Sequence, residues 1–121
     1  MPGRETGHAA SRAIVAGDIV LGAGWGGAAT HAVTAGSTDK RGEVVITASA
    51  TTPAQATSTV VLTFAQAYGD TPFAVVIQSA NDEAATVQPP RDVVATTTTL
   101  TWKSSVVPVS TKIYKYIWMV D

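Results

Sequence analysis

The chain has 121 residues, of which 45% are hydrophobic and 14% are charged, and its formal net charge is −1. This length fits one domain. The eight Lys and Arg residues are scattered, which argues against a nucleic-acid-binding protein, because such proteins carry a basic face. The absence of cysteine excludes disulfides, a thiol nucleophile and a cysteine-ligated metal. No apolar run has the length of a signal peptide or a membrane span, so we expect no membrane insertion.

The first residues form a polar, glycine-containing stretch without periodicity, which predicts an N-terminal arm. We place the arm at residues 1–20 and the folded domain at residues 21–121. Residues 13–21 are apolar and β-branched around a turn signal at Gly17-Asp18. The apolar residues are largely Ala and Val, and only 7% of the chain is aromatic. We therefore expect a thin core and the recruitment of neighbouring subunits to bury apolar surface.

The rest of the chain has the pattern of short strands separated by turns. Residues 36–42 form one such turn, in which we expect Asp39 to accept backbone N–H bonds. Residues 59–64 alternate cleanly, which places Val60, Leu62 and Phe64 on one face. Residues 112–120 are apolar on both faces, which is typical of a central strand or of a subunit interface. No segment has convincing helical periodicity. The sequence predicts an all-β antiparallel sandwich or jelly roll, with further strands at residues 30–34, 43–48, 73–78 (a buried strand), 93–97 and 98–102.

Motifs for catalysis or cofactor binding are weak. Gly22, Gly24 and Gly27 match G-x-G-x-x-G, but no helix follows them, so we interpret the cluster as a tight crossover rather than a dinucleotide site. The two histidines, His8 and His31, lack a metal-ligand spacing. No G-x-S-x-G motif is present, and the carboxylates that could be paired for hydrolysis lie in turns: Asp70, Asp82, Glu83 and Asp92. We expect no enzyme, no cofactor and no metal.

Aromatic residues offer the best candidates for ligand contact. Tyr68 and Trp102 lie near predicted loops, and exposed rings there could stack on a sugar. The alternating trio Tyr114, Tyr116 and Trp118 is better explained as core or interface, although a sugar platform stays open.

The stretch GAGWG, followed by a short strand and GSTDKRGEVVITA, resembles a small β domain found in virion surface proteins of tailed bacteriophages. The later segment TTPAQATSTVVLTFAQAYGDTPFAVVIQSAND continues the likeness, which covers residues 22–120. The resemblance implies a β-sandwich knob that is commonly trimeric and exposed on a virion. Its signature positions are Gly24, Trp25, Gly26, Asp39, Arg41 and Gly42. Asp39 and Arg41 would fix the hairpin or pair across a subunit boundary, and Trp25 would pack where backbones approach closely.

The stretch ahead of the knob is too short for a fibre shaft, so the resemblance favours a homotrimeric capsid decoration protein on the phage head. It would be made in the host cytoplasm and attach through its arm to the major capsid protein or another virion protein, with Arg4, Arg12 and Ile14 as contacts. Such trimers sometimes hold an axial ion, for which His31 or Asp39 would be candidates. The alternative is a tail-tip module that binds a host receptor or surface glycan through Tyr68 and Trp102.

Overall fold

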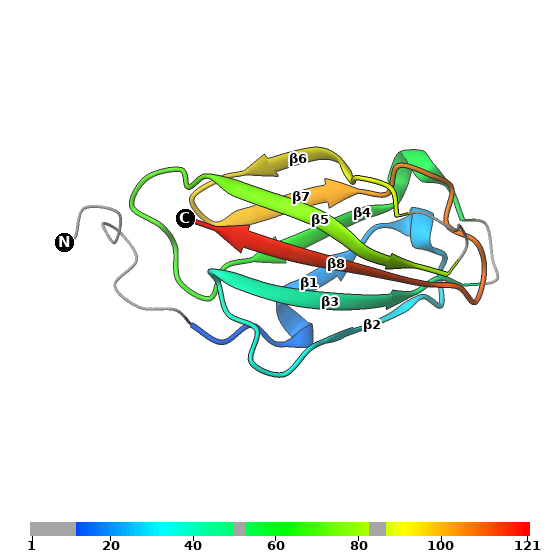
Figure 1. Cartoon of the computed structure of the whole chain (residues 1–121), viewed down its shortest axis with the longest axis horizontal. Helices are drawn as coiled ribbons and strands as arrows, with labels where there is room; N and C mark the ends of the chain where they lie inside the picture. The colour runs from blue at the N-terminus through cyan, green and yellow to red at the C-terminus, as the bar shows by residue number, and fades with distance from the viewer. Residues whose placement is uncertain (1–11, 50–52, 83–86) are drawn as a thin grey trace.

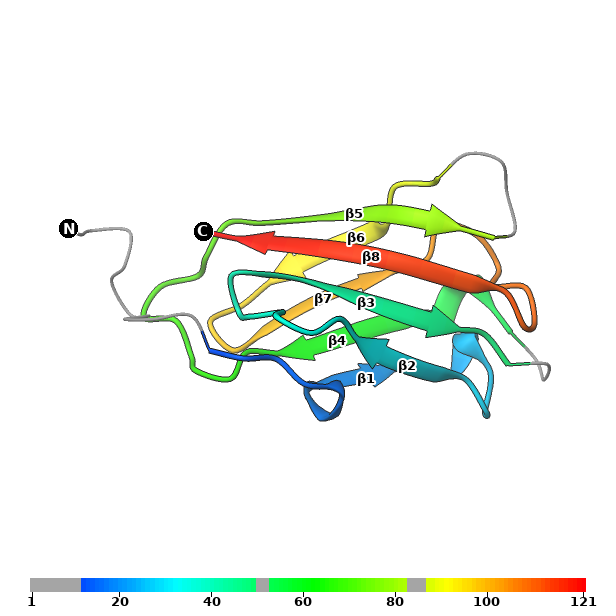
Figure 2. The ribbon, with the colours of Figure 1, turned by 60° about the horizontal axis from the view of Figure 1, so that its bottom comes forward.

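The computed structural model describes residues 12–49, 53–82 and 87–121. Within them the chain forms eight strands in two antiparallel four-stranded sheets that pack face to face (Figures 1 and 2). The first sheet has the order β1 (Ile19–Leu21), β4 (Thr59–Thr63), β7 (Thr99–Lys103), β6 (Arg91–Ala95). The second has the order β2 (Thr30–Val33), β3 (Arg41–Thr47), β8 (Ile113–Val120), β5 (Ala74–Asn81). The predicted antiparallel sandwich is confirmed, while the jelly-roll winding stays a prediction.

Short 3₁₀ turns are the only helical segments in the described ranges: η2 (Ala16–Asp18), η3 (Ala23–Trp25) and η4 (Gln55–Thr57). Alternation along the strands builds the core between the sheets. On β4, Val60 and Leu62 point inward and are fully buried, and they pair with Trp102 and Leu100 of β7. The inward face predicted for residues 59–64 is therefore confirmed, because Phe64 is buried as well.

Strand β8 is central in its sheet, since it pairs with β3 on one side and with β5 on the other (Figure 1). Its inward residues Tyr114, Tyr116 and Trp118 are fully buried, so the trio belongs to the core and is not a sugar platform. Trp25 meets two of these rings edge to face, with ring centroids 5.4 Å from Tyr114 and 6.3 Å from Tyr116. Large aromatic side chains therefore fill much of the space between the two sheets, where small side chains were expected.

Strand β5 differs from the prediction of a buried strand. It lies at the edge of its sheet, and only alternate residues face the core. Val76 and Gln78 are buried, whereas Val75 and Ile77 are 53% and 44% exposed. A continuous apolar run does not distinguish a strand covered on both faces from an edge strand with one exposed apolar face.

The body of the domain begins earlier than the predicted boundary at residue 20. Ala13 forms an antiparallel bridge with Thr38, the Ile14 amide donates to the Ser37 carbonyl at 3.0 Å, and β1 pairs with β4. Ile14 and Ile19 are both in the core. The turn expected at Gly17-Asp18 is the 3₁₀ turn η2, which leads into β1.

Candidate interaction surface

The glycine cluster forms a tight crossover, as predicted. A Cβ on Gly22 or Gly24 would overlap the chain between Ala54 and Thr59, so that segment can approach only because both positions lack a side chain. Gly26 has φ 101°, a conformation that favours glycine. Trp25, between these glycines, is fully buried, and its indole Nε1 donates to the Thr59 carbonyl at 3.0 Å. This part of the signature has a packing role.

Asp39 fastens two loops together from a fully buried position. Its carboxylate oxygens accept the backbone N–H groups of Ala65 at 2.8 Å and Gln66 at 3.3 Å, and its own N–H donates to the Arg12 carbonyl at 2.8 Å. The predicted acceptor role is confirmed, although the donors belong to the loop after β4 and not to the hairpin of Asp39. Its burial rules out a pair across a subunit boundary and contact with an axial ion.

Gly42 and Arg41 begin β3 on opposite sides of the sheet. A Cβ on Gly42 would overlap the indole of Trp118 and the side chain of Ser37, so this glycine permits close packing. Arg41 is exposed on the outer face. Within the described parts of the chain its guanidinium has no ion-pair partner, so pairing across a subunit boundary stays a prediction for Arg41.

Both candidate ligand aromatics are buried, which makes the expectation of exposed rings wrong. Trp102 is 1% exposed and Tyr68 is 8% exposed. Trp102 lies on β7, where it pairs with Val60 and packs 5.7 Å from the ring of Tyr116. Tyr68 follows β4 but packs edge to face on Phe64 at 4.9 Å. Proximity to a loop in the sequence did not translate into exposure, because each ring turns into the gap between the sheets.

The three candidate capsid contacts differ in their exposure to solvent. Ile14 is 4% exposed, and its side chain is therefore core and not contact surface, which corrects that expectation. Arg12 is exposed, and its Nε donates to Gln66 Oε1 at 3.1 Å, beside the place where residues 1–11 join the body. Arg4 lies outside the described residues.

The histidines and carboxylates that the sequence offered as candidates form no cluster among the described residues. Asp92 pairs with Lys103 at 3.3 Å on the surface, His31 Nε2 lies 2.8 Å from the Ala16 carbonyl oxygen, and Glu83 and His8 lie outside the described residues. Among residues 12–49, 53–82 and 87–121, no three His, Asp or Glu side chains gather as metal ligands. No helix of this part of the chain is long and apolar enough to cross a membrane.

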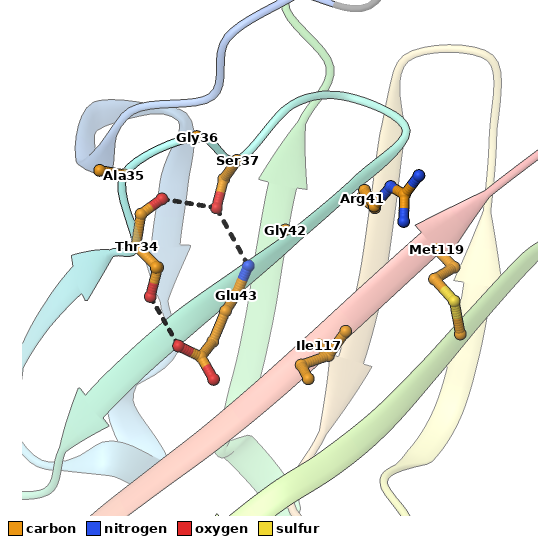
Figure 3. Close-up of a pocket in the computed structure, with 9 residues that line it drawn as sticks. All are labelled: Thr34, Ala35, Gly36, Ser37, Arg41, Gly42, Glu43, Ile117 and Met119. Atoms are coloured by element: carbon orange, nitrogen blue, oxygen red, sulfur yellow. Dashed lines mark hydrogen bonds between the residues drawn. The ribbon is translucent and has the colours of Figure 1, made fainter.

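A hollow of about 320 Å³ opens on the outer face of the second sheet, between the β2–β3 turn and β8 (Figure 3). Ile117 and Met119 form its apolar side, and Arg41 and Glu43 stand on β3 beside them. The Thr34 hydroxyl donates to Glu43 Oε1 at 2.6 Å, and the Ser79 hydroxyl donates to Oε2 at 3.4 Å. These two bonds hold the carboxylate between β2 and β5.

A row of apolar side chains runs from this hollow across β8 to β5, and we call it the apolar stripe: Phe73, Val75, Ile77 and Met119, which are exposed, and Ile117, which is half-buried. The register pairs Val75 with Met119 and Ile77 with Ile117, so the members are neighbours across β5 and β8. Phe73 is 85% exposed and Met119 is 47% exposed. Exposed apolar side chains that adjoin one another in this way are common at protein interaction sites.

The outer face of the first sheet is different. Its central strands β4 and β7 present Thr59, Thr63, Thr99 and Thr101, with Val61 between them. Hydroxyl groups on that face can bond with water. Val20 and Val94 are also exposed on this face, where they flank Val61 and Thr101, so its apolar side chains are smaller and are interspersed with hydroxyl groups.

The sequence reasoning missed the apolar stripe and Glu43. The segment FAVVI carried the signal, because Phe73, Val75 and Ile77 share one face of any strand. Whether that face turns to the core or to solvent depends on which strand pairs beside it, and this is not readable locally. No protein-family model, curated protein or solved structure matches this chain.

Proposed function

We propose that this chain is a structural protein of a bacteriophage virion, a homotrimeric β-sandwich knob that decorates the capsid surface. The observation that carries the proposal is the apolar stripe, an interaction surface on the outer face of the sandwich, made of residues such as Phe73 and Met119. The resemblance of the GAGWG and GSTDKRG segments to phage surface domains supports the virion setting. The role is assembly, without chemical turnover.

Attachment to the capsid is assigned to the N-terminal segment that ends at Arg12. Asp39 accepts bonds from the loop after β4 and donates to the Arg12 carbonyl, so this segment leaves the body at a fixed point. Arg4 and Arg12 are its charged candidates for contact with the major capsid protein. The alternative glycan-binding role loses its two named residues, since Tyr68 and Trp102 are buried.

The test is the copy number of the protein in purified particles, measured by quantitative gel densitometry against the major capsid protein. A decoration protein is expected at a copy number comparable with that of the capsid protein. A few copies per particle would move the protein to the tail, and its absence from particles would contradict the proposal.

A further inference from the structure

Two opposite charges stand beside the apolar stripe on the same outer face. Arg41 pairs in register with Met119, and Glu43 pairs with Ile117. The two charged residues are therefore two positions apart on the same face of β3. Within the described residues neither charge has an ion-pair partner. A neighbouring copy, rotated about an axis beside the stripe, would bring its Arg41 to Glu43 of the first copy while the stripes converge on that axis. Lys115 of β8 also lies on this outer face, in register with Val45, so the face carries charges of both signs, and Arg41 and Glu43 can pair between copies.

Glu43 is oriented before any partner arrives. Its hydrogen bonds from Thr34 and Ser79 hold the carboxylate in place, which reduces the side-chain entropy lost when a partner cation binds. Charge pairs at the border of an apolar contact set orientation and suppress wrong partners. Arg41 supplies a guanidinium that can bind a carboxylate through two parallel hydrogen bonds.

The size of the face suits a stable contact. Strands of 4, 7, 8 and 8 residues, about 4.8 Å apart and with about 3.3 Å per residue, give the second sheet roughly 430 Å² in projection. Side-chain relief raises the accessible area above this value, toward the roughly 800 Å² that each partner buries in a standard interface. The projecting ring of Phe73, which buries on the order of 150–250 Å² when covered, adds to it.

We propose that the apolar stripe is buried against neighbouring copies of this chain around a shared axis, with Arg41 of one copy paired to Glu43 of the next. This proposal rests on the proposed function, which sets the number of copies in the assembly at three. In a closed ring each copy gives its Arg41 to one neighbour and its Glu43 to the other, while the stripes surround the axis.

A matched pair of valines tests the position of the contact in the full chain. Val75 is in the stripe and 53% exposed, and Val20 is 62% exposed at the edge of the other sheet. Sedimentation velocity is expected to show that Val75→Asp weakens assembly at least about tenfold, whereas Val20→Asp assembles as the wild type does. Equal assembly of both variants would overturn the proposal. Circular dichroism and the thermal midpoint check that each variant is folded, and Phe73→Ser, outside the strand bounds, replaces Val75→Asp if that variant unfolds.

The charge pair is tested by reversal and restoration. Arg41→Glu places two carboxylates at the contact and is expected to weaken assembly by about tenfold or more. Glu43→Arg should do the same, and the double variant should recover assembly because the pair is restored with exchanged positions. A double variant no better than either single variant overturns the pairing. Because Glu43→Arg also removes the bond from Thr34, Glu43→Gln, which keeps an acceptor and drops the charge, separates the two effects.

Failure of this inference and failure of the proposed function give different results. A protein that assembles through the stripe but is absent from particles leaves the contact standing and removes the virion role. A protein present in particles whose Val75→Asp variant assembles like Val20→Asp leaves the virion role standing and removes this contact. A monomeric wild type over the whole concentration range overturns the contact directly.

Discussion

A fully buried carboxylate at Asp39 joins the start of the described chain, the β2–β3 turn and the loop after β4. Asp39→Asn keeps the shape but replaces one acceptor oxygen with an amide donor that faces a backbone N–H. We expect the free energy of unfolding to fall by about 1–3 kcal/mol, because a charge-assisted bond is lost and a partly buried N–H is left without an acceptor. Urea unfolding measures the change.

The matched control is Asp70→Asn, since Asp70 is an exposed turn residue. We expect this variant to stay within about 0.5 kcal/mol of the wild type. Equal stabilities of the two variants would contradict the fastening role of Asp39.

Tyr116 makes stability depend on pH at the alkaline end. Burial raises the pKa of its phenol above the ordinary value, and the bond from Gln78 Nε2 to the phenol oxygen, 3.3 Å long, opposes part of that rise. The folded state therefore holds the proton more tightly than the unfolded chain does. This contribution is complete below about pH 10, the pKa of an unburied tyrosine, and it is lost as the pH rises from there through the folded pKa.

Tyr116→Phe removes that titration. We expect the variant to lose roughly 0.5–1.5 kcal/mol at neutral pH, because the Gln78 amide loses its partner, and to show a shallower decline above about pH 10. The measurement is the urea midpoint at a series of pH values. Parallel declines of the two proteins would show that another group controls alkaline unfolding.

Single residues show where sequence reasoning succeeded and where it could not. The acceptor role of Asp39 was readable because Asp in a Gly-rich turn bonds backbone N–H groups, but its donors lie 26 and 27 residues away. The burial of Tyr68 and Trp102 was not readable, because exposure depends on which strands stack above a ring. Trp102 is the clearest case, since its register with Val60 faces it inward.

At the scale of elements, the crossover at η3 depends on backbone contact with the segment that includes η4. Gly24→Ala would place a methyl group against the backbone of Ala54, Thr57 and Ser58. We expect a loss of about 3 kcal/mol in the free energy of unfolding, because backbone atoms on both sides must move. Thermal and urea unfolding measure it.

Gly17→Ala is the control for Gly24→Ala, since a Cβ at Gly17 meets nothing within 4 Å. We expect a change between zero and a gain of about 1 kcal/mol, because alanine restricts the unfolded chain. Similar losses at the two glycines would argue against close approach as the reason for Gly24.

The positions of the strands in the sequence were well predicted, but the burial of β5 was not. Alternation at residues 59–64 and the two apolar faces of residues 112–120 led to β4 and to the central strand β8. Strand β5 was expected to be buried, yet it lies at the edge of its sheet and pairs only with β8. Whether a strand has one neighbour or two depends on contacts between distant segments of the chain. That same choice leaves Phe73, Val75 and Ile77 exposed and creates the apolar stripe.

For the whole molecule, the pattern of short alternating strands and turns predicted the fold class, and an exposed apolar face fits the expected need for neighbours. The expected core of small side chains is wrong, because three tryptophans and Tyr114 and Tyr116 are fully buried in it, yet Phe73 and Met119 are still left exposed. The order of strands in each sheet could not be read from the sequence, since it depends on contacts between distant segments. The hollow at Arg41 and Glu43 follows from that order.

The central claim is that the chain assembles with itself into a trimer. The most direct measurement is the mass of the purified wild-type protein in solution, by light scattering coupled to size exclusion, over a range of concentrations. Each chain has a mass of 12.4 kDa, so the account predicts a species of about three times this mass. A mass of 12.4 kDa at every concentration would contradict it.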